Sequence, residues 1–193
     1  MKPRFFAAAV SAIALLAGCG RSPQTTFYTL TPLSVPAETL QAVPHAPTVS
    51  IAAVSLPELV DRPQLVVPDQ GSQVLVLEGQ RWAEPLKSAI PRVLAEDLAR
   101  LIGAERVSAY PQYAAGRADY RIFIDLQRFE TTGQAVLVDA LWTLKPSTDG
   151  RVTVRRSQFK EPLQGGGYEA LVQAYSRALA GLATAIAKEV AQL

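Results

Sequence analysis

The sequence predicts a single α/β or α+β domain, with a mixed β-sheet that includes an antiparallel meander and two long amphipathic helices. Two stretches, 85–102 and 168–192, carry apolar residues three or four positions apart, as one buried helix face requires. Alternating polar and apolar residues at 119–129 and 135–145 indicate neighbouring strands. Short apolar runs between prolines and glycines supply further strands nearer the N-terminus.

Residues 1–18 have the layout of a secretory signal peptide. Lys2 and Arg4 precede an apolar run, and small residues lead into Cys19, the only cysteine of the chain. This ending resembles the bacterial lipobox, in which the peptide is cut before a cysteine that becomes acylated. An ordinary signal peptide or a short membrane anchor is the alternative, although the run is shorter than the about 20 residues that span a bilayer.

Lipid on Cys19 would hold residues 19–193 on a membrane, because two or more acyl chains anchor a protein stably. Inner-membrane lipoproteins of enteric bacteria typically carry aspartate after the cysteine. Gly20 stands here instead, so we expect the protein at the outer membrane, on its periplasmic face. Residues 19–25 form the lipidated cysteine and a short tether, and residues 26–193 form the domain.

The mature chain carries 17 cationic and 17 acidic residues once Lys2 and Arg4 are removed with the signal peptide. This balance gives no sign of the clustered basic face that nucleic-acid binding needs, so no nucleic-acid partner is expected. Acylation of Cys19 leaves no free thiol for a disulfide or a cysteine metal site. We therefore expect no cofactor other than the covalent lipid.

The first half of the domain is expected to contain four strands. Prolines across 32–47 indicate an extended loop between the first two. The second run is apolar enough for a central strand covered on both faces, and two prolines bound the turn at 57–63 after it. Glu78 and Gly79 are expected to end the fourth strand. The four strands are placed at 26–31, 48–56, 64–67 and 73–77.

The first long helix is expected to open around residues 81–85, with Pro85 in its first helical position, and to stop at Gly103. Pro91 lies inside this helix. An interior proline costs about 3 kcal/mol and kinks a helix, so we expect a bend near residues 87–91. A short strand at 106–110 follows.

The second half is expected to form the meander and the last helix. A hairpin loop at 131–134 joins its first two strands, and the third strand covers 151–159. The outer face of this meander should carry solvated charges. Three glycines at 165–167 then precede the helix, as a flexible joint or, alternatively, a phosphate-binding turn that lacks any recognised phosphate motif.

No constellation in the sequence indicates catalysis. The single histidine, His45, lies in the proline-rich loop without a nucleophile motif nearby. The adjacent carboxylates Glu96 and Asp97 point about 100° apart on a helix and cannot face one site. No cluster has the spacing of a metal site. We therefore expect a protein that is not an enzyme and holds no metal.

Four residues are candidates for binding a protein partner: Leu59, Asp61, Arg62 and Trp82. Two prolines stiffen the exposed turn that carries the first three, and tryptophan is enriched where interfaces are strongest. Alternatively, Trp82 packs at the start of the helix, and Asp61 and Arg62 form a solvated pair.

Three segments together resemble the ABC-type transport auxiliary lipoproteins, the PqiC-like family: LPELVDRPQLV at 56–66, RWAEPL at 81–86 and RVLAEDL at 92–98. The FYTL segment at 27–30 is similar to that family as well. The resemblance implies an α/β fold similar to the N-terminal domain of TolB. It also implies an outer-membrane accessory of an MCE-type ABC system that moves lipids between the two membranes, with an MCE-domain membrane protein as partner.

Two other functions stay open from the sequence. A stand-alone lipid carrier would need an internal apolar cavity. A structural envelope lipoprotein would bind peptidoglycan or assist outer-membrane assembly. Self-association into a homo-oligomer is also open, and the sequence does not identify the lipid moved.

Overall fold

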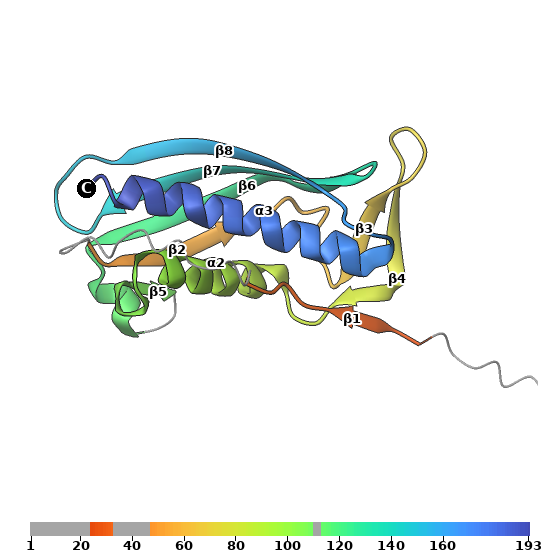
Figure 1. Ribbon diagram of the computed structural model, residues 1–193, viewed down its shortest axis with the longest axis horizontal. Coiled ribbons are helices and arrows are strands. Elements are labelled where there is room, and N and C mark those ends of the chain that lie inside the picture. The colour runs from red at the N-terminus through yellow and green to blue at the C-terminus, as the bar shows by residue number, and fades with distance from the viewer. Residues whose placement is uncertain (1–23, 33–46, 110–112) are drawn as a thin grey trace, which may run out of the picture.

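The structure, a computed structural model, describes residues 24–32, 47–109 and 113–193. Within them the chain forms two β-sheets and two long helices, which confirms the expected single domain of mixed sheet and helices (Figure 1). The predictions about Cys19, the signal peptide and His45 concern residues outside this description.

The larger sheet has five strands in the order β5-β2-β6-β7-β8. β2 lies parallel to β5 and to β6, whereas β6, β7 and β8 pair antiparallel, so the meander is confirmed. Gly133, with φ of 59°, forms the tight connection between β6 and β7 together with Gln134. The strands are β2 (Val49–Ser55), β5 (Val107–Ala109), β6 (Tyr120–Thr132), β7 (Ala135–Pro146) and β8 (Thr153–Pro162).

β6 extends three residues beyond the predicted end. An irregularity between Leu126 and Arg128 shifts its register against β7. Before it Leu126 is buried, and after it Phe129 and Thr131 are buried. The alternation therefore changes phase at 126–128, and a strictly alternating pattern stops too early.

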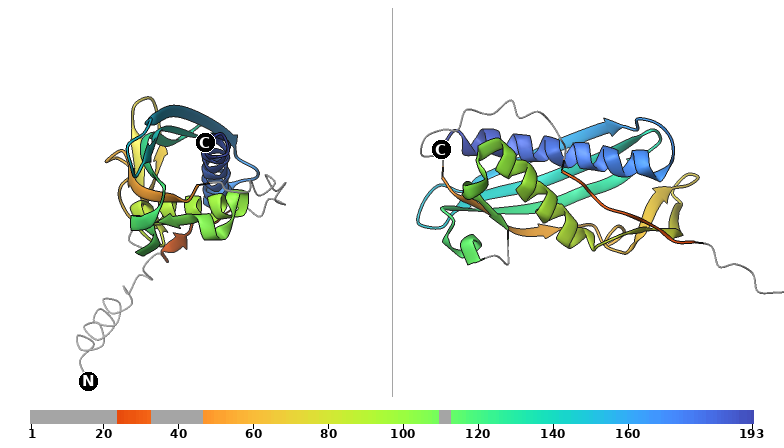
Figure 2. Two further views of the ribbon diagram at one scale, coloured as in Figure 1. Left: turned by 90° about the vertical axis from the view of Figure 1, so that its left-hand side faces the viewer. Right: turned by 60° about the horizontal axis from the view of Figure 1, so that its bottom comes forward.

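Two helices cover one face of this sheet: α2 (Leu86–Ile102) against β2 and β5, and α3 (Gly167–Val190) against β7 and β8. They lie side by side, as Figure 2 shows. α2 runs without interruption through Pro91. Pro85 is not in the first helical position as expected but precedes it, with an extended ψ of 135°, and Gly103 ends the helix at φ of 106°.

The smaller sheet has the order β1-β4-β3, with β1 (Thr26–Tyr28) parallel to β4 (Val74–Trp82), and β4 antiparallel to β3 (Gln64–Pro68). The prediction that β4 ends at Glu78 and Gly79 is wrong. β1 pairs with residues 80–82 and so extends β4 up to Trp82, which was expected at the helix start. This partner lies over fifty residues away in sequence, so no local pattern reveals it.

The chain after β1 lies between the two helices, where Figure 2 shows it crossing them. Leu30 is buried there, and its carbonyl accepts a hydrogen bond from Arg92 of α2 at 3.3 Å. The Thr31 amide donates to Ser176 Oγ of α3 at 3.2 Å. These contacts hold the segment after β1 against both helices.

The sheet face opposite the helices departs from two expectations. β2 is covered on both faces only over Val49–Ile51, since Ala53 and Ser55 are exposed. The short helix η2 (Tyr113–Arg117) contacts β2. The face is also not purely charged, because Phe123 and Leu141 are exposed on it. A second short helix, η1 (Ala104–Arg106), joins α2 to β5.

Candidate functional site

The turn at 57–63 joins β2 to β3 and is held by its own backbone. The amides of Val60 and Asp61 donate to the Pro57 carbonyl at 3.1 and 3.3 Å, and the Arg62 amide donates to the Val60 carbonyl at 2.9 Å. Val60 is buried in the core, which leaves Leu59, Asp61 and Arg62 exposed on the turn. The structure thus presents these three predicted residues on one hydrogen-bonded turn.

A groove of about 310 Å³ lies between this turn and the start of α2. Asp61 and Arg62 line one part of it, and Trp82 lines another, so three of the four predicted residues meet at one place. Leu59 is exposed on the same turn but does not line the groove. The Trp82 amide donates to the Pro63 carbonyl at 2.7 Å and joins the two walls.

Two ion pairs hold the groove walls in position. Lys87 Nζ lies 2.6 Å from Asp61 Oδ2 and links the turn to the first turn of α2. Arg92 Nη2 lies 2.5 Å from Glu84 Oε1, and this hydrogen bond raises the pKa of the Arg92 guanidinium. Because the partners remain partly exposed to solvent, each pair contributes at most about 1 kcal/mol. Their effect is to orient charge around the groove.

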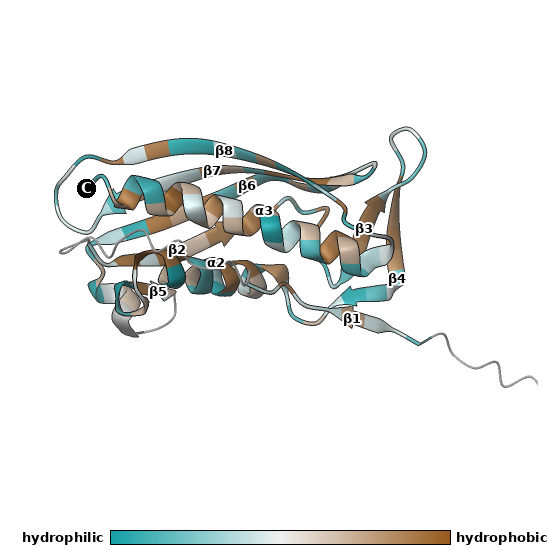
Figure 3. Ribbon diagram, viewed as in Figure 1, coloured by the Kyte–Doolittle hydropathy of each residue, from teal (hydrophilic) through white to brown (hydrophobic). Residues whose placement is uncertain are grey.

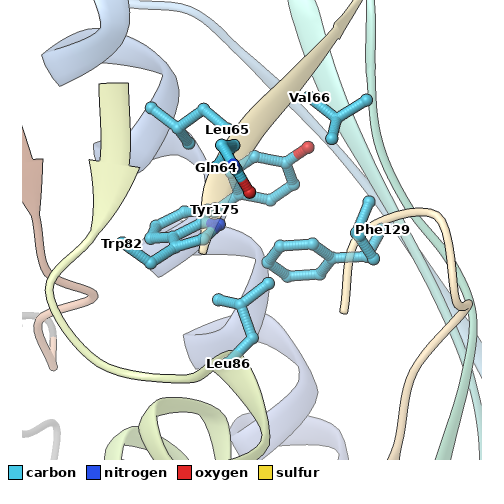
Figure 4. A pocket seen from close by; sticks show the side chains of 8 residues that line it. Gln64, Leu65, Val66, Trp82, Leu86, Phe129 and Tyr175 are labelled. Carbon is cyan, nitrogen blue, oxygen red and sulfur yellow. The ribbon is translucent and has the colours of Figure 1, made fainter. Parts of the chain in front are cut away.

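An aromatic cluster shares Trp82 with the groove, and Figure 4 shows its rings. Trp82, only 6% exposed, meets the edge of Tyr175 at 6.2 Å between ring centroids, and Tyr175 stacks on Phe129 at 4.1 Å. Burial raises the pKa of the Tyr175 hydroxyl, which lies 3.4 Å from Thr131 Oγ1. Trp82 therefore packs in the core, which agrees with the packing alternative given for it from the sequence. Part of its surface also lines the groove.

A small space of about 10 Å³ lies beside this cluster, roughly the volume that one water requires. Tyr175 lies on the buried stripe of α3, whose spacing is visible in the sequence, but nothing in the sequence pairs it with Phe129 or Trp82. Three elements supply these rings: β4, β6 and α3. Only the fold brings them together.

Two properties of the described residues bear on this site. Across residues 24–32, 47–109 and 113–193, no three histidine, cysteine or acidic side chains gather closely enough to hold a metal ion. In the same residues, no helix has the length and apolar character needed to cross a bilayer. The groove offers shape, one apolar wall and flanking charges, which are the features of a binding surface.

The chain is similar to known proteins along most of its length. The family model described as "ABC-type transport auxiliary lipoprotein component" matches residues 28–187. A solved structure of an uncharacterized protein has a TM-score of 0.71 and 18% identity, and the match covers 86% of this chain and 99% of that one. No curated protein sequence matches the chain.

A second solved structure, protein XCC0632 from Xanthomonas campestris, belongs to the DUF330 family. It has a TM-score of 0.67 and 22% identity, with 84% of this chain and 93% of that chain covered. At these identities the two structures establish the fold of this chain.

Proposed function

Since this chain belongs to the family of ABC-type transport auxiliary lipoprotein components, we propose that it is an outer-membrane-anchored periplasmic accessory of an MCE-type ABC system. In this proposal it has no catalytic role. It docks an MCE-domain membrane protein while lipid passes between the inner and outer membranes. Lipid on Cys19 attaches it to the outer membrane.

The groove beside the turn at 57–63 is the observation that carries the docking proposal. It presents Arg62 and Asp61 on a backbone that is hydrogen-bonded to itself and to β4. Interfaces depend on such preorganised surfaces, because little entropy is lost when the partner binds. Tyr175 of the aromatic cluster packs against Trp82 and so supports the part of the groove that Trp82 lines.

A stand-alone lipid carrier is the second candidate. An acyl chain needs an apolar pocket of some hundreds of Å³. The space at the aromatic cluster is about 10 Å³, and the groove of about 310 Å³ is lined by Asp61, Arg62 and Glu84 beside its apolar residues. The small volume of the first and the charged lining of the second favour docking over carriage. Genes for an ATPase, a permease and an MCE-domain protein beside this one would support the same choice.

The test is binding of the MCE-domain protein to the lipidated protein, compared between two charge reversals. Arg62→Glu changes the groove, whereas Arg151→Glu changes an exposed position in the turn before β8. We expect the first variant to weaken binding and the second to leave it unchanged, with equal melting temperatures. Equal binding by both variants would show that the groove is not part of the interface.

A further inference from the structure

The β3–β4 hairpin is an apolar ribbon that the domain leaves partly uncovered. Between residues 64 and 77 the only charged residue is Asp69. Val66 pairs with Val76, Val67 with Leu75 and Pro68 with Val74, so apolar side chains occupy both faces of the ribbon. Figure 3 shows β3 and the first part of β4 as mostly hydrophobic.

Toward its tip the ribbon is exposed. Val74 is 44% and Leu75 46% accessible, and Pro68 is exposed beside them. A two-stranded hairpin is only marginally stable in water, and an exposed apolar strand invites association. Apolar residues on both faces therefore indicate that a further surface covers this ribbon.

The hairpin lies at the end of the molecule where the chain enters the domain. Figures 1 and 2 both place it at the same end as the start of β1. Tyr28 of β1 lies beside Tyr168 in the first turn of α3, with 6.4 Å between ring centroids. The other end of α3, 24 residues long, is about 36 Å away at about 1.5 Å per residue.

Little chain separates Cys19 from this end. Five residues lead from Cys19 to Gln24, where the described structure begins, and they reach at most about 18 Å at roughly 3.5 Å each. An acyl anchor on Cys19 thus holds the hairpin end near the bilayer. Phe27, the most exposed large apolar side chain described, also lies on β1 at this end.

We propose that the β3–β4 hairpin, through Val74 and Leu75, contacts the lipid surface to which Cys19 is anchored. This contact rests on the lipid anchor of the proposed function. It adds a second, non-covalent attachment that sets the orientation of the domain and so the direction in which the groove faces.

The hairpin tip limits the depth of this contact. Residues 69–73 are polar, and their turn is closed by a hydrogen bond from the Asp69 amide to the Gln73 carbonyl at 2.9 Å. Burying such a tip among acyl chains would leave polar groups without partners. The ribbon therefore lies edge-on in the headgroup region, so that Val74 and Leu75, which point to its opposite faces, both reach the boundary of the acyl chains.

A single-label experiment tests this placement. Acylation uses the only thiol, so Val74→Cys gives the lipidated full-length protein one reactive site. Val154→Cys is the matched control, because Val154 is 51% exposed and precedes Arg155, which pairs with Glu189 in the last turn of α3. Each variant carries an environment-sensitive fluorophore and is reconstituted in phosphatidylethanolamine and phosphatidylglycerol vesicles that contain nitroxide-labelled lipid.

We expect loss of fluorescence at position 74 and little loss at 154, with stronger quenching by nitroxide near the headgroup than near the chain end. Protein that floats with the vesicles but is quenched equally at both positions overturns the contact while the anchor stands. Emission at 74 that shifts with protein concentration and not with lipid overturns it in favour of a second copy. Protein that does not float at all overturns the anchor, and this proposal with it.

Discussion

Replacing Trp82 by alanine separates its packing role from any role in binding. The side chain is 6% exposed and its ring meets Tyr175, which itself stacks on Phe129. Truncating a buried tryptophan costs about 3–5 kcal/mol, through lost burial and the cavity that is left. A domain of this size has a free energy of unfolding of about 5–15 kcal/mol, so Trp82→Ala should remain folded but close to its limit.

Urea unfolding followed by far-ultraviolet circular dichroism measures this loss directly. Arg62→Glu, at an exposed position, should change the unfolding free energy by no more than about 0.5 kcal/mol. Trp82→Phe keeps an aromatic ring beside Tyr175 and should lose less than Trp82→Ala. If Trp82→Ala lowered stability by less than about 1 kcal/mol and still abolished partner binding, Trp82 would be an interface residue and the packing argument would be refuted.

Three further predictions concern the sheet, α3 and the anchor. A hydrogen bond from Arg156 lowers the pKa of the buried Asp139 carboxyl. The ionised carboxylate therefore stabilises the folded protein above about pH 3.9, the unfolded pKa, and this stabilisation is lost as the pH falls through the lower pKa of the folded state. Asp139→Asn should destabilise the protein at neutral pH and make its stability in urea titrations less dependent on acid pH. Gly181→Ala gains about 1 kcal/mol of helix propensity, but the new Cβ would lie 2.7 Å from the Phe159 ring, at a cost of about 1–3 kcal/mol. The substitution should therefore stabilise the protein only when Phe159 is also replaced by alanine. Equal changes in stability with and without Phe159→Ala would disprove the clash. Cys19→Ala should abolish labelling by a palmitate analogue, and label that persists would disprove lipidation.

Local sequence signals predicted the parts of the fold that depend on local periodicity. The stripe of α3 and the strands of the meander were foreseen because buried or half-buried residues recur in them at regular spacing, interrupted in β6 only at 126–128. The start of α2 was misplaced since β1 holds Trp82 in a strand, and that pairing is long-range. Pattern analysis cannot detect a partner so distant in sequence.

The candidate site was foreseen only in part. The two prolines correctly indicated an exposed turn, and the structure brings Asp61, Arg62 and Trp82 to one groove. The Asp61 partner is Lys87 of α2 and not Arg62, as one alternative had assumed. The sequence of the β3–β4 hairpin, with one charged residue between 64 and 77, already indicates an apolar ribbon. Only the folded structure shows that this ribbon lies at the same end as β1.

Direct binding of the MCE-domain protein to the lipidated protein tests the central proposal most closely. Isothermal titration in detergent should give saturable binding without ATP or metal, weakened by Arg62→Glu and unchanged by Arg151→Glu. A protein that ignores the MCE-domain protein yet extracts phospholipid from vesicles would contradict the docking proposal and establish a lipid carrier instead.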